Sequence, residues 1–184
     1  VAVGDEVADL LVQKLSKSMK NLKFGAYTDS TNDFGPVITK QHQQSVINHI
    51  SSAEKQGANI VVDGRNAIVS GYENGFYVGG TLIDKVTPQM DSYKAEIFGP
   101  VLQIVRVATM KDAMSLIDNH EYGNGTCIFT RDGEAARYFS DHIKVGMVGV
   151  NIPLPVPVAY HSFGGWKRSL FGDLHAYGPD SIRF

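Results

Sequence analysis

The sequence contains very little cysteine, since Cys127 is the single one among 184 residues. One cysteine cannot form a disulfide within the chain, and it cannot build a cysteine-based zinc cluster. This scarcity fits a reducing compartment, either the cytoplasm or, in a eukaryote, the mitochondrial matrix. The six histidines are scattered, and His42 and His49 lie two helical turns apart, too far for one metal site. We therefore expect solvated or core histidines and no metal site.

Long apolar runs and an excess of one charge are also missing. No stretch reaches the roughly 18 apolar residues of a transmembrane helix, so we expect no membrane partner. Seventeen basic and 19 acidic residues leave a net charge of -2, which gives no indication of a nucleic-acid partner. The first residues, VAVGDEVADL, resemble neither a signal nor a transit peptide. They lack Met and open within a helical pattern, so we expect a fragment of a longer protein.

Two common nucleotide-binding motifs are absent as well. The glycine clusters YGNGT and FGGWKRSLFG match neither G-x-G-x-x-G after a strand nor the P-loop pattern. This chain therefore carries no dinucleotide fingerprint and no P-loop of its own.

Four segments have the sequence features of helices. Apolar residues at spacings of three and four predict an amphipathic helix that runs to about Leu22. A second helix is expected to begin after Thr39 and to end near Gly57. Thr109, with Asp112 three residues later, and Asp132 stand where they would cap two further helices.

Short apolar runs between these helices predict strands. They are ANIVVDG, pieces around the turn signal Asn74-Gly75, VLQIVRV, GTCIFT and VGMVGVN. Strands that alternate with helices favour an α/β fold, with a largely parallel sheet and flanking helices. Ligands bind beyond the carboxyl ends of such strands. The places to look are therefore the segments after Val107, Thr130 and Asn151.

Two residues attract attention as candidates for chemistry. Cys127 could be a nucleophile, but it lies inside the strand-like run GTCIFT. Free cysteine is usually a small buried hydrophobe, so a structural role is favoured. Glu96 stands just before a Phe-Gly-Pro turn in YKAEIFGPVL. It is either a surface acid or a carboxylate held at a strand end to bind a ligand hydroxyl, and this stretch alone does not decide between them.

Four motifs in register resemble the aldehyde dehydrogenase superfamily along the whole chain. They are EIFGPVL, YGNGTCIFT, GMVGVN and SFGGWKRS. Within the superfamily, NIPLPVPV and FGDLHAYG are similar to the methylmalonate-semialdehyde (malonate-semialdehyde) dehydrogenase branch, which transfers the acyl group to coenzyme A. The resemblance implies a catalytic domain of that family, NAD as cofactor, CoA as acyl acceptor, a small semialdehyde as substrate and a homo-oligomeric parent enzyme.

The resemblance also implies roles for four residues. Glu96 matches the acid that hydrogen-bonds the nicotinamide ribose, and Phe98 matches the aromatic beside the nicotinamide ring. Phe163 matches an aromatic that lines the substrate tunnel, and Asn151 with the loop from Ile152 to Tyr160 would form the neighbouring wall. Plain packing remains an alternative for Phe163.

The chain departs from the family pattern at both ends. The family's nucleophilic cysteine precedes the first helix, Cys127 does not align with it, and a terminal strand should follow Phe184. We therefore expect residues 1–184 to be the C-terminal part of the catalytic domain, inactive alone, with the dinucleotide-binding domain outside this chain. The alternatives are a non-acylating semialdehyde dehydrogenase fragment and a noncatalytic binding module with the same fold.

Overall fold

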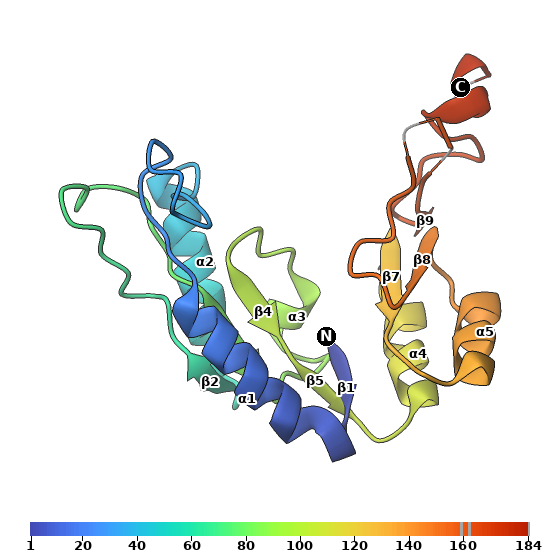
Figure 1. Cartoon of the computed structure of the whole chain (residues 1–184), viewed down its shortest axis with the longest axis horizontal. Coiled ribbons are helices and arrows are strands. Elements are labelled where there is room, and N and C mark those ends of the chain that lie inside the picture. The colour runs from blue at the N-terminus through green and yellow to red at the C-terminus, as the bar shows by residue number, and fades with distance from the viewer. Residues whose placement is uncertain (159, 162, 184) are drawn as a thin grey trace. The chain divides into compact units, whose positions relative to one another are not determined.

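The computed structural model describes residues 1–158, 160–161 and 163–183. The chain divides into two units, Val1–Thr109 and Met110–Phe184, which are considered separately below (Figure 1). Both combine helices with parallel strand pairs, which confirms the predicted α/β class. Among the described helices, none has the length and apolar character that crossing a bilayer requires.

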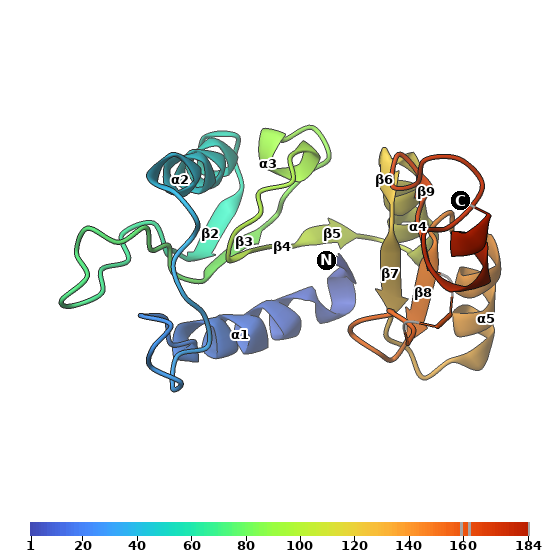
Figure 2. The same ribbon diagram turned by 90° about the horizontal axis from the view of Figure 1, so that it is seen from above.

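The first unit contains three helices and five strands. The elements are, in chain order, β1 Ala2–Gly4, α1 Asp5–Asn21, α2 Lys40–Lys55, β2 Asn59–Val62, β3 Thr81–Asp84, α3 Asp91–Lys94, β4 Val101–Gln103 and β5 Val105–Val107. β3 runs parallel to β4 and antiparallel to β2, while β5 runs parallel to β1. Figure 2 shows α1 and α2 on opposite sides of β3 and β4. Apolar side chains on both faces of these strands can therefore pack against a helix.

The core of this unit follows from the apolar spacing of its helices. Ala8 of α1 is fully buried with Leu82 and Ile104, and the half-buried side chains of α1 pack against them. On α2, Val46, Ile50 and Ala53 have no exposed surface. Thr39 caps α2 as predicted, because its hydroxyl accepts a hydrogen bond from the His42 N–H at 3.0 Å.

Two expectations about strands in this unit were wrong in detail. In the run from residue 65 to 86, the expected strand after the turn is present as β3 Thr81–Asp84, but residues 63–80, all described, contain no strand. They contain a turn in which the Gly75 N–H bonds to the Tyr72 carbonyl. The run VLQIVRV is divided at Ile104 into β4, which pairs with β3, and β5, which pairs with β1. This single apolar run thus contributes one strand to each of two sheets.

Charged side chains fasten the edges of the first unit. The Arg106 guanidinium binds both oxygens of the buried Asp84 carboxylate, at 3.1 and 2.8 Å, and also the exposed Asp9. Burial by itself would raise the pKa of Asp84, but the hydrogen bonds from Arg106 and from the Lys85 N–H outweigh it and lower that pKa. Asp84 is therefore held as a carboxylate inside the sheet.

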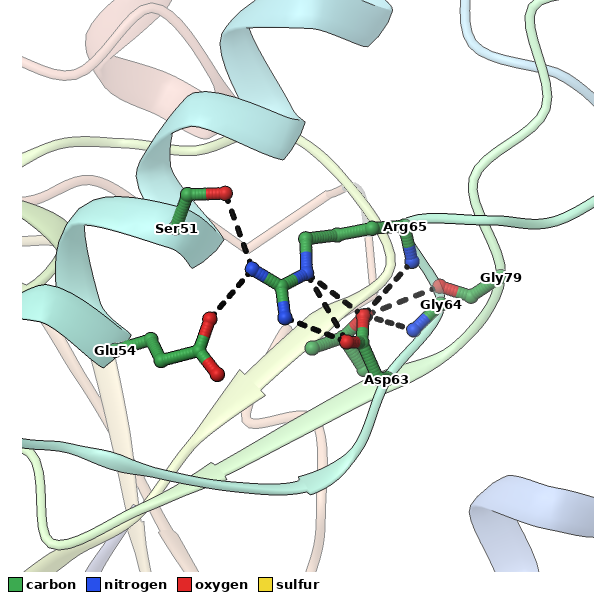
Figure 3. Close-up of polar contacts among 7 residues, drawn as sticks. Ser51, Glu54, Asp63, Gly64, Arg65 and Gly79 are labelled. Carbon is green, nitrogen blue, oxygen red and sulfur yellow. Dashed lines mark hydrogen bonds and ion pairs between the residues drawn. The ribbon is translucent and has the colours of Figure 1, made fainter.

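A second arginine joins α2 to the loop after β2 (Figure 3). Arg65 binds Asp63 with two nitrogens and reaches Glu54 and Ser51 on α2. The hydrogen bonds from the Arg65 side chain to the Asp63 carboxylate lower the pKa of Asp63. Beside them, the Gly79 N–H donates to the Gly64 carbonyl at 2.9 Å, and a Cβ on Gly64 would collide with the Gly79 backbone. Only glycine fits at this crossing of two chain segments.

The second unit has a smaller core. Its elements are α4 Met110–Asn119, β6 Tyr122–Gly123, β7 Gly125–Ile128, α5 Gly133–His142, β8 Met147–Val150, β9 Trp166–Lys167 and the 3₁₀ turn η1 Gly178–Ile182. β7 and β8 are parallel, and Met114 of α4 meets Phe139 of α5 in the core beside them. Asp132 caps α5 as predicted, accepting from the Glu134 and Ala135 N–H groups, and α4 begins directly after Thr109.

The SFGGWKRS motif connects the end of α4 to the C-terminal segment; its first residue, Ser162, lies outside the described residues. Lys167 belongs to β9, and its ammonium donates to the carbonyls of Ile117, Asp118 and His120 at 2.8, 3.1 and 3.0 Å. A cation at a helix C-terminus satisfies carbonyl oxygens that have no partner within the helix. Most of this motif therefore has a structural role.

Replacing Lys167 with methionine should destabilise the second unit by about 1.5–3 kcal/mol, because three carbonyl groups lose a charged donor. Trp166 is the chain's single tryptophan and lies next to Lys167, so denaturant unfolding followed by its fluorescence reports on this unit. The control is Arg168→Met, which removes an exposed ion pair with Glu121 and should cost less than about 1 kcal/mol. Equal effects of the two substitutions would contradict the capping role.

Candidate functional site

The segment from Glu96 to Pro100 forms a tight loop between α3 and β4. Ile97 anchors this loop, since it is 9% exposed, whereas Phe98 beside it is 78% exposed. Glu96 is also exposed. The backbone of Phe98 is left-handed, with φ at 53°. The loop thus turns its apolar anchor inward and presents a carboxylate and an aromatic ring at the surface.

Four contacts hold this loop in place. The Thr81 N–H donates to the Pro100 carbonyl at 2.8 Å, and the Val101 N–H donates to the Gly99 carbonyl at 2.7 Å. His42 Nε2 lies 2.8 Å from the Phe98 carbonyl oxygen. A Cβ on Gly99 would lie 2.9 Å from Val46 Cγ2, so the loop touches α2 directly.

The Glu96 carboxylate itself makes no hydrogen bond or ion pair with the described residues. That leaves its two oxygens open to donors from outside the unit. An ionised carboxylate only accepts hydrogen bonds, and two oxygens suit a pair of neighbouring hydroxyl groups. The structure thus places Glu96 and Phe98 together on one exposed loop.

Asn151 lies directly after β8, and its side chain is already engaged. Its Oδ1 accepts from the Thr130 N–H and its Nδ2 donates to the Thr130 carbonyl, both at 2.9 Å. Its φ is 57°, a left-handed conformation in which asparagine is enriched. The amide therefore ties the ends of β7 and β8 together and fixes the start of the loop that follows.

Phe163 is half-buried and stacks on Tyr177, with ring centroids 4.5 Å apart and planes 16° apart. Within the described residues this contact favours the packing interpretation of its ring. The loop after Asn151 exposes Ile152, Leu154, Val156 and Val158 by 54%, 75%, 57% and 58%. Ala159, within the predicted wall, lies outside the described residues. The loop therefore presents apolar side chains to its surroundings.

Cys127 lies in β7, as predicted, but the expectation that it is buried was wrong. The thiol is half-exposed, and it faces Gly149 of β8, where a Cβ would lie 3.1 Å from its Sγ. The glycine opposite leaves room for the sulfur. Across the described residues, no group of three or more His, Cys, Asp or Glu side chains could hold a metal ion.

Two residues near these sites escaped the sequence analysis. His42 was grouped with solvated or core histidines, yet it contacts the Phe98 loop. Lys167 was read only as part of a motif, yet it caps α4. Both act on partners about 50 residues away in sequence, 56 and 50 respectively. No local pattern reports such pairings.

Comparison with known proteins decides the family. The model of the aldehyde dehydrogenase family matches residues 1–184, the whole chain. The chain belongs to the aldehyde dehydrogenase family. This confirms the resemblance that the four motifs indicated.

Several relatives with high identity to this chain are semialdehyde dehydrogenases. A malonate-semialdehyde dehydrogenase of Pseudomonas aeruginosa is 65% identical over 184 residues, which is 100% of this chain and 37% of the relative. The crystal structure of a methylmalonate-semialdehyde dehydrogenase from Oceanimonas doudoroffii is 76% identical, with a TM-score of 0.95 over 98% of this chain and 37% of that one. The chain thus spans little more than a third of the length of these aldehyde dehydrogenases.

A third relative was crystallised with a cofactor. It is described as a putative methylmalonate-semialdehyde dehydrogenase from Sinorhizobium meliloti complexed with NAD. It is 56% identical, with a TM-score of 0.96 over 98% of this chain and 37% of that one. The fold described above is therefore that of the corresponding third of these enzymes.

Proposed function

We propose that this chain is part of the catalytic domain of an NAD-dependent, CoA-acylating methylmalonate- or malonate-semialdehyde dehydrogenase. The dinucleotide-binding domain and the nucleophilic cysteine belong to residues outside 1–184, and the full-length enzyme is a homo-oligomer. The proposal is supported by the identities of 65% and 76% to two semialdehyde dehydrogenases and by the NAD bound to a third relative.

A single structural observation carries the cofactor assignment. Glu96 is an exposed carboxylate without a partner among the described residues, and two positions later Phe98 exposes 78% of its surface from a fixed loop. Most of the Phe98 ring and the Glu96 carboxylate are thus left available to a ligand. The pair fits a ribose with two hydroxyl donors joined to a flat ring, which is the nicotinamide half of NAD.

The chain's own residues would then orient the cofactor. When bound, NAD accepts the hydride that leaves the substrate's aldehyde carbon. Glu96 accepts hydrogen bonds from the ribose hydroxyls, and Phe98 packs beside the ring. Because the loop is held to α2 and β3, Glu96 and Phe98 would hold a bound cofactor in one orientation, which matters because small displacements from reacting geometry are costly.

The substrate reaction uses groups from outside this chain as well. In the full-length enzyme, a cysteine thiolate outside residues 1–184 would add to the aldehyde carbon, and loss of a hydride to NAD would turn the adduct into a thioester. The CoA thiol would take the acyl group and leave its proton to the cysteine sulfur. We assign Cys127 no part in this sequence. Phe163 and Asn151 contribute indirectly to the substrate side, Phe163 through its stack on Tyr177 and Asn151 by fixing the start of the loop after β8.

The proposal is tested with the full-length protein that carries this sequence. Methylmalonate and malonate semialdehyde should each be oxidised with one acyl-CoA formed per NADH when CoA is present. The isolated chain, assayed as the control, should form no NADH. A free acid as the main product, at a rate that CoA does not change, would instead support the non-acylating alternative. Absence of NAD binding by the full-length protein would support the noncatalytic module.

A further inference from the structure

The residue that most directly determines the position of Phe98 lies on another element. His42 stands in the first turn of α2, where the bond from its backbone N–H to the Thr39 hydroxyl, 3.0 Å long, fixes its backbone. From there its half-buried ring reaches the loop 56 residues later, with Nε2 2.8 Å from the Phe98 carbonyl oxygen. The two rings also meet edge to face, with centroids 6.5 Å apart.

The chemistry of this contact defines the state of the imidazole. A carbonyl oxygen only accepts hydrogen bonds, so His42 Nε2 must carry a proton and donate it. The edge-to-face contact with the Phe98 ring also limits rotation of the imidazole. His42 therefore donates a hydrogen bond from a fixed position to the Phe98 carbonyl oxygen.

The Phe98 backbone needs such a donor. Its φ of 53° places a bulky residue in the left-handed region, which costs free energy and persists only where the surroundings hold it. Val46, one turn after His42 on α2, lies against Gly99, where even a Cβ would be only 2.9 Å from Val46 Cγ2, so the loop has little room to move toward the helix. His42 and Val46 thus hold the left-handed turn from adjacent positions on one helix face.

We propose that His42 is a positioning residue for the cofactor site: by donating from Nε2 to the Phe98 carbonyl, it keeps Phe98 left-handed and so orients both the exposed ring and the Glu96 carboxylate. This inference rests on the proposed function, because it assumes that Glu96 and Phe98 bind the nicotinamide riboside. Without the hydrogen bond, the loop would relax toward extended backbone and turn the Phe98 ring away.

The test compares glutamine and asparagine at this position in the full-length enzyme. The amide nitrogen of glutamine extends about as far as Nε2 of histidine, whereas that of asparagine is one methylene shorter. His42→Gln should keep the dissociation constant for NAD and the single-turnover rate within about threefold of wild type. His42→Asn should weaken NAD binding by about three- to tenfold, the loss of one hydrogen bond, and slow hydride transfer as well. His49→Leu, two turns later on the same helix, is the control and should change neither.

The outcomes separate this inference from the proposed function. If Glu96→Gln weakens NAD binding but His42→Asn does not, the positioning role is wrong and the function stands. If neither variant changes NAD binding, the cofactor assignment is wrong. Equal behaviour of His42→Gln and His42→Asn would also overturn the positioning role, because only the longer amide is expected to keep the hydrogen bond to the Phe98 carbonyl. Hydrogen exchange of the Val101 amide, which donates to the Gly99 carbonyl at 2.7 Å, gives a readout independent of activity and should accelerate in His42→Asn alone.

Discussion

Gly64→Ala should destabilise the first unit by about 3 kcal/mol or more, the largest stability effect expected here. The added Cβ would collide with the carbonyl oxygen and Cα of Gly79, which are backbone atoms and cannot rotate away. Relief requires the two segments to separate, and separation breaks the bond from the Gly79 N–H to the Gly64 carbonyl. It also strains the 3.0 Å bond from the Gly64 N–H to the buried Thr81 hydroxyl.

The measurement is denaturant unfolding followed by far-UV circular dichroism. α1 and α2, with 17 and 16 residues, are the longest helices and belong to the first unit, so they dominate this signal. Gly35→Ala is the matched control, because the nearest atom to its Cβ is 3.8 Å away and its φ is ordinary. That variant should stay within about 1 kcal/mol of wild type. A Gly64→Ala chain as stable as Gly35→Ala would show that the two segments do not cross this closely.

The four longer helices, α1, α2, α4 and α5, could be predicted because their signals are local, whereas the short α3 and η1 were not predicted. Thr39 and Asp132 cap α2 and α5 with hydrogen bonds to N–H groups no more than three residues away. Apolar spacing then indicates which face is buried. Both kinds of information lie within one or two helical turns of sequence.

The strands were harder to predict because their partners are distant in sequence. Nothing local in VLQIVRV shows that Val101 pairs with Thr81 while Val105 pairs with Ala2. The Asn74-Gly75 signal did yield a turn, but the flanking residues find their contacts elsewhere, as when the Gln43 side chain bonds to the Tyr77 carbonyl. A turn propensity is intrinsic, whereas a hairpin also needs two complementary strands.

The same contrast between local signals and distant partners applies to the candidate site. Glu96 and Phe98 stand out in the sequence because the motif carries them, and the structure adds that both are exposed on one loop. The roles of His42 and of the Asn151 amide were not visible, since each depends on one carbonyl or N–H group of a distant segment. Asn151 offered only a weak hint, the tolerance of asparagine for left-handed backbone.

Replacing Glu96 with glutamine in the full-length enzyme should weaken NAD binding by about ten- to hundredfold. Glutamine preserves the length of the side chain and one acceptor oxygen, so it removes chiefly the charge that strengthens hydrogen bonds to the ribose. The fold should not change, because Glu96 is exposed and has no partner among the described residues, while Ile97 and the contacts of Gly99 and Pro100 determine the loop. Hydride transfer should slow in addition, since a displaced nicotinamide lies off reacting geometry.

Titration of NAD binding and single-turnover kinetics on saturated enzyme would separate these two effects. Glu6→Gln, which removes an equally exposed carboxylate on α1, controls for the change in net charge. Glu96→Asp retains the charge on a shorter side chain, so it should lose less affinity than glutamine if charge dominates and more if reach dominates. If Glu96→Gln leaves both NAD affinity and hydride transfer within twofold of wild type, Glu96 is an ordinary surface acid. The exposed ring of Phe98 would then need another explanation, because the loop would present it without the carboxylate that makes the pair fit a nicotinamide riboside.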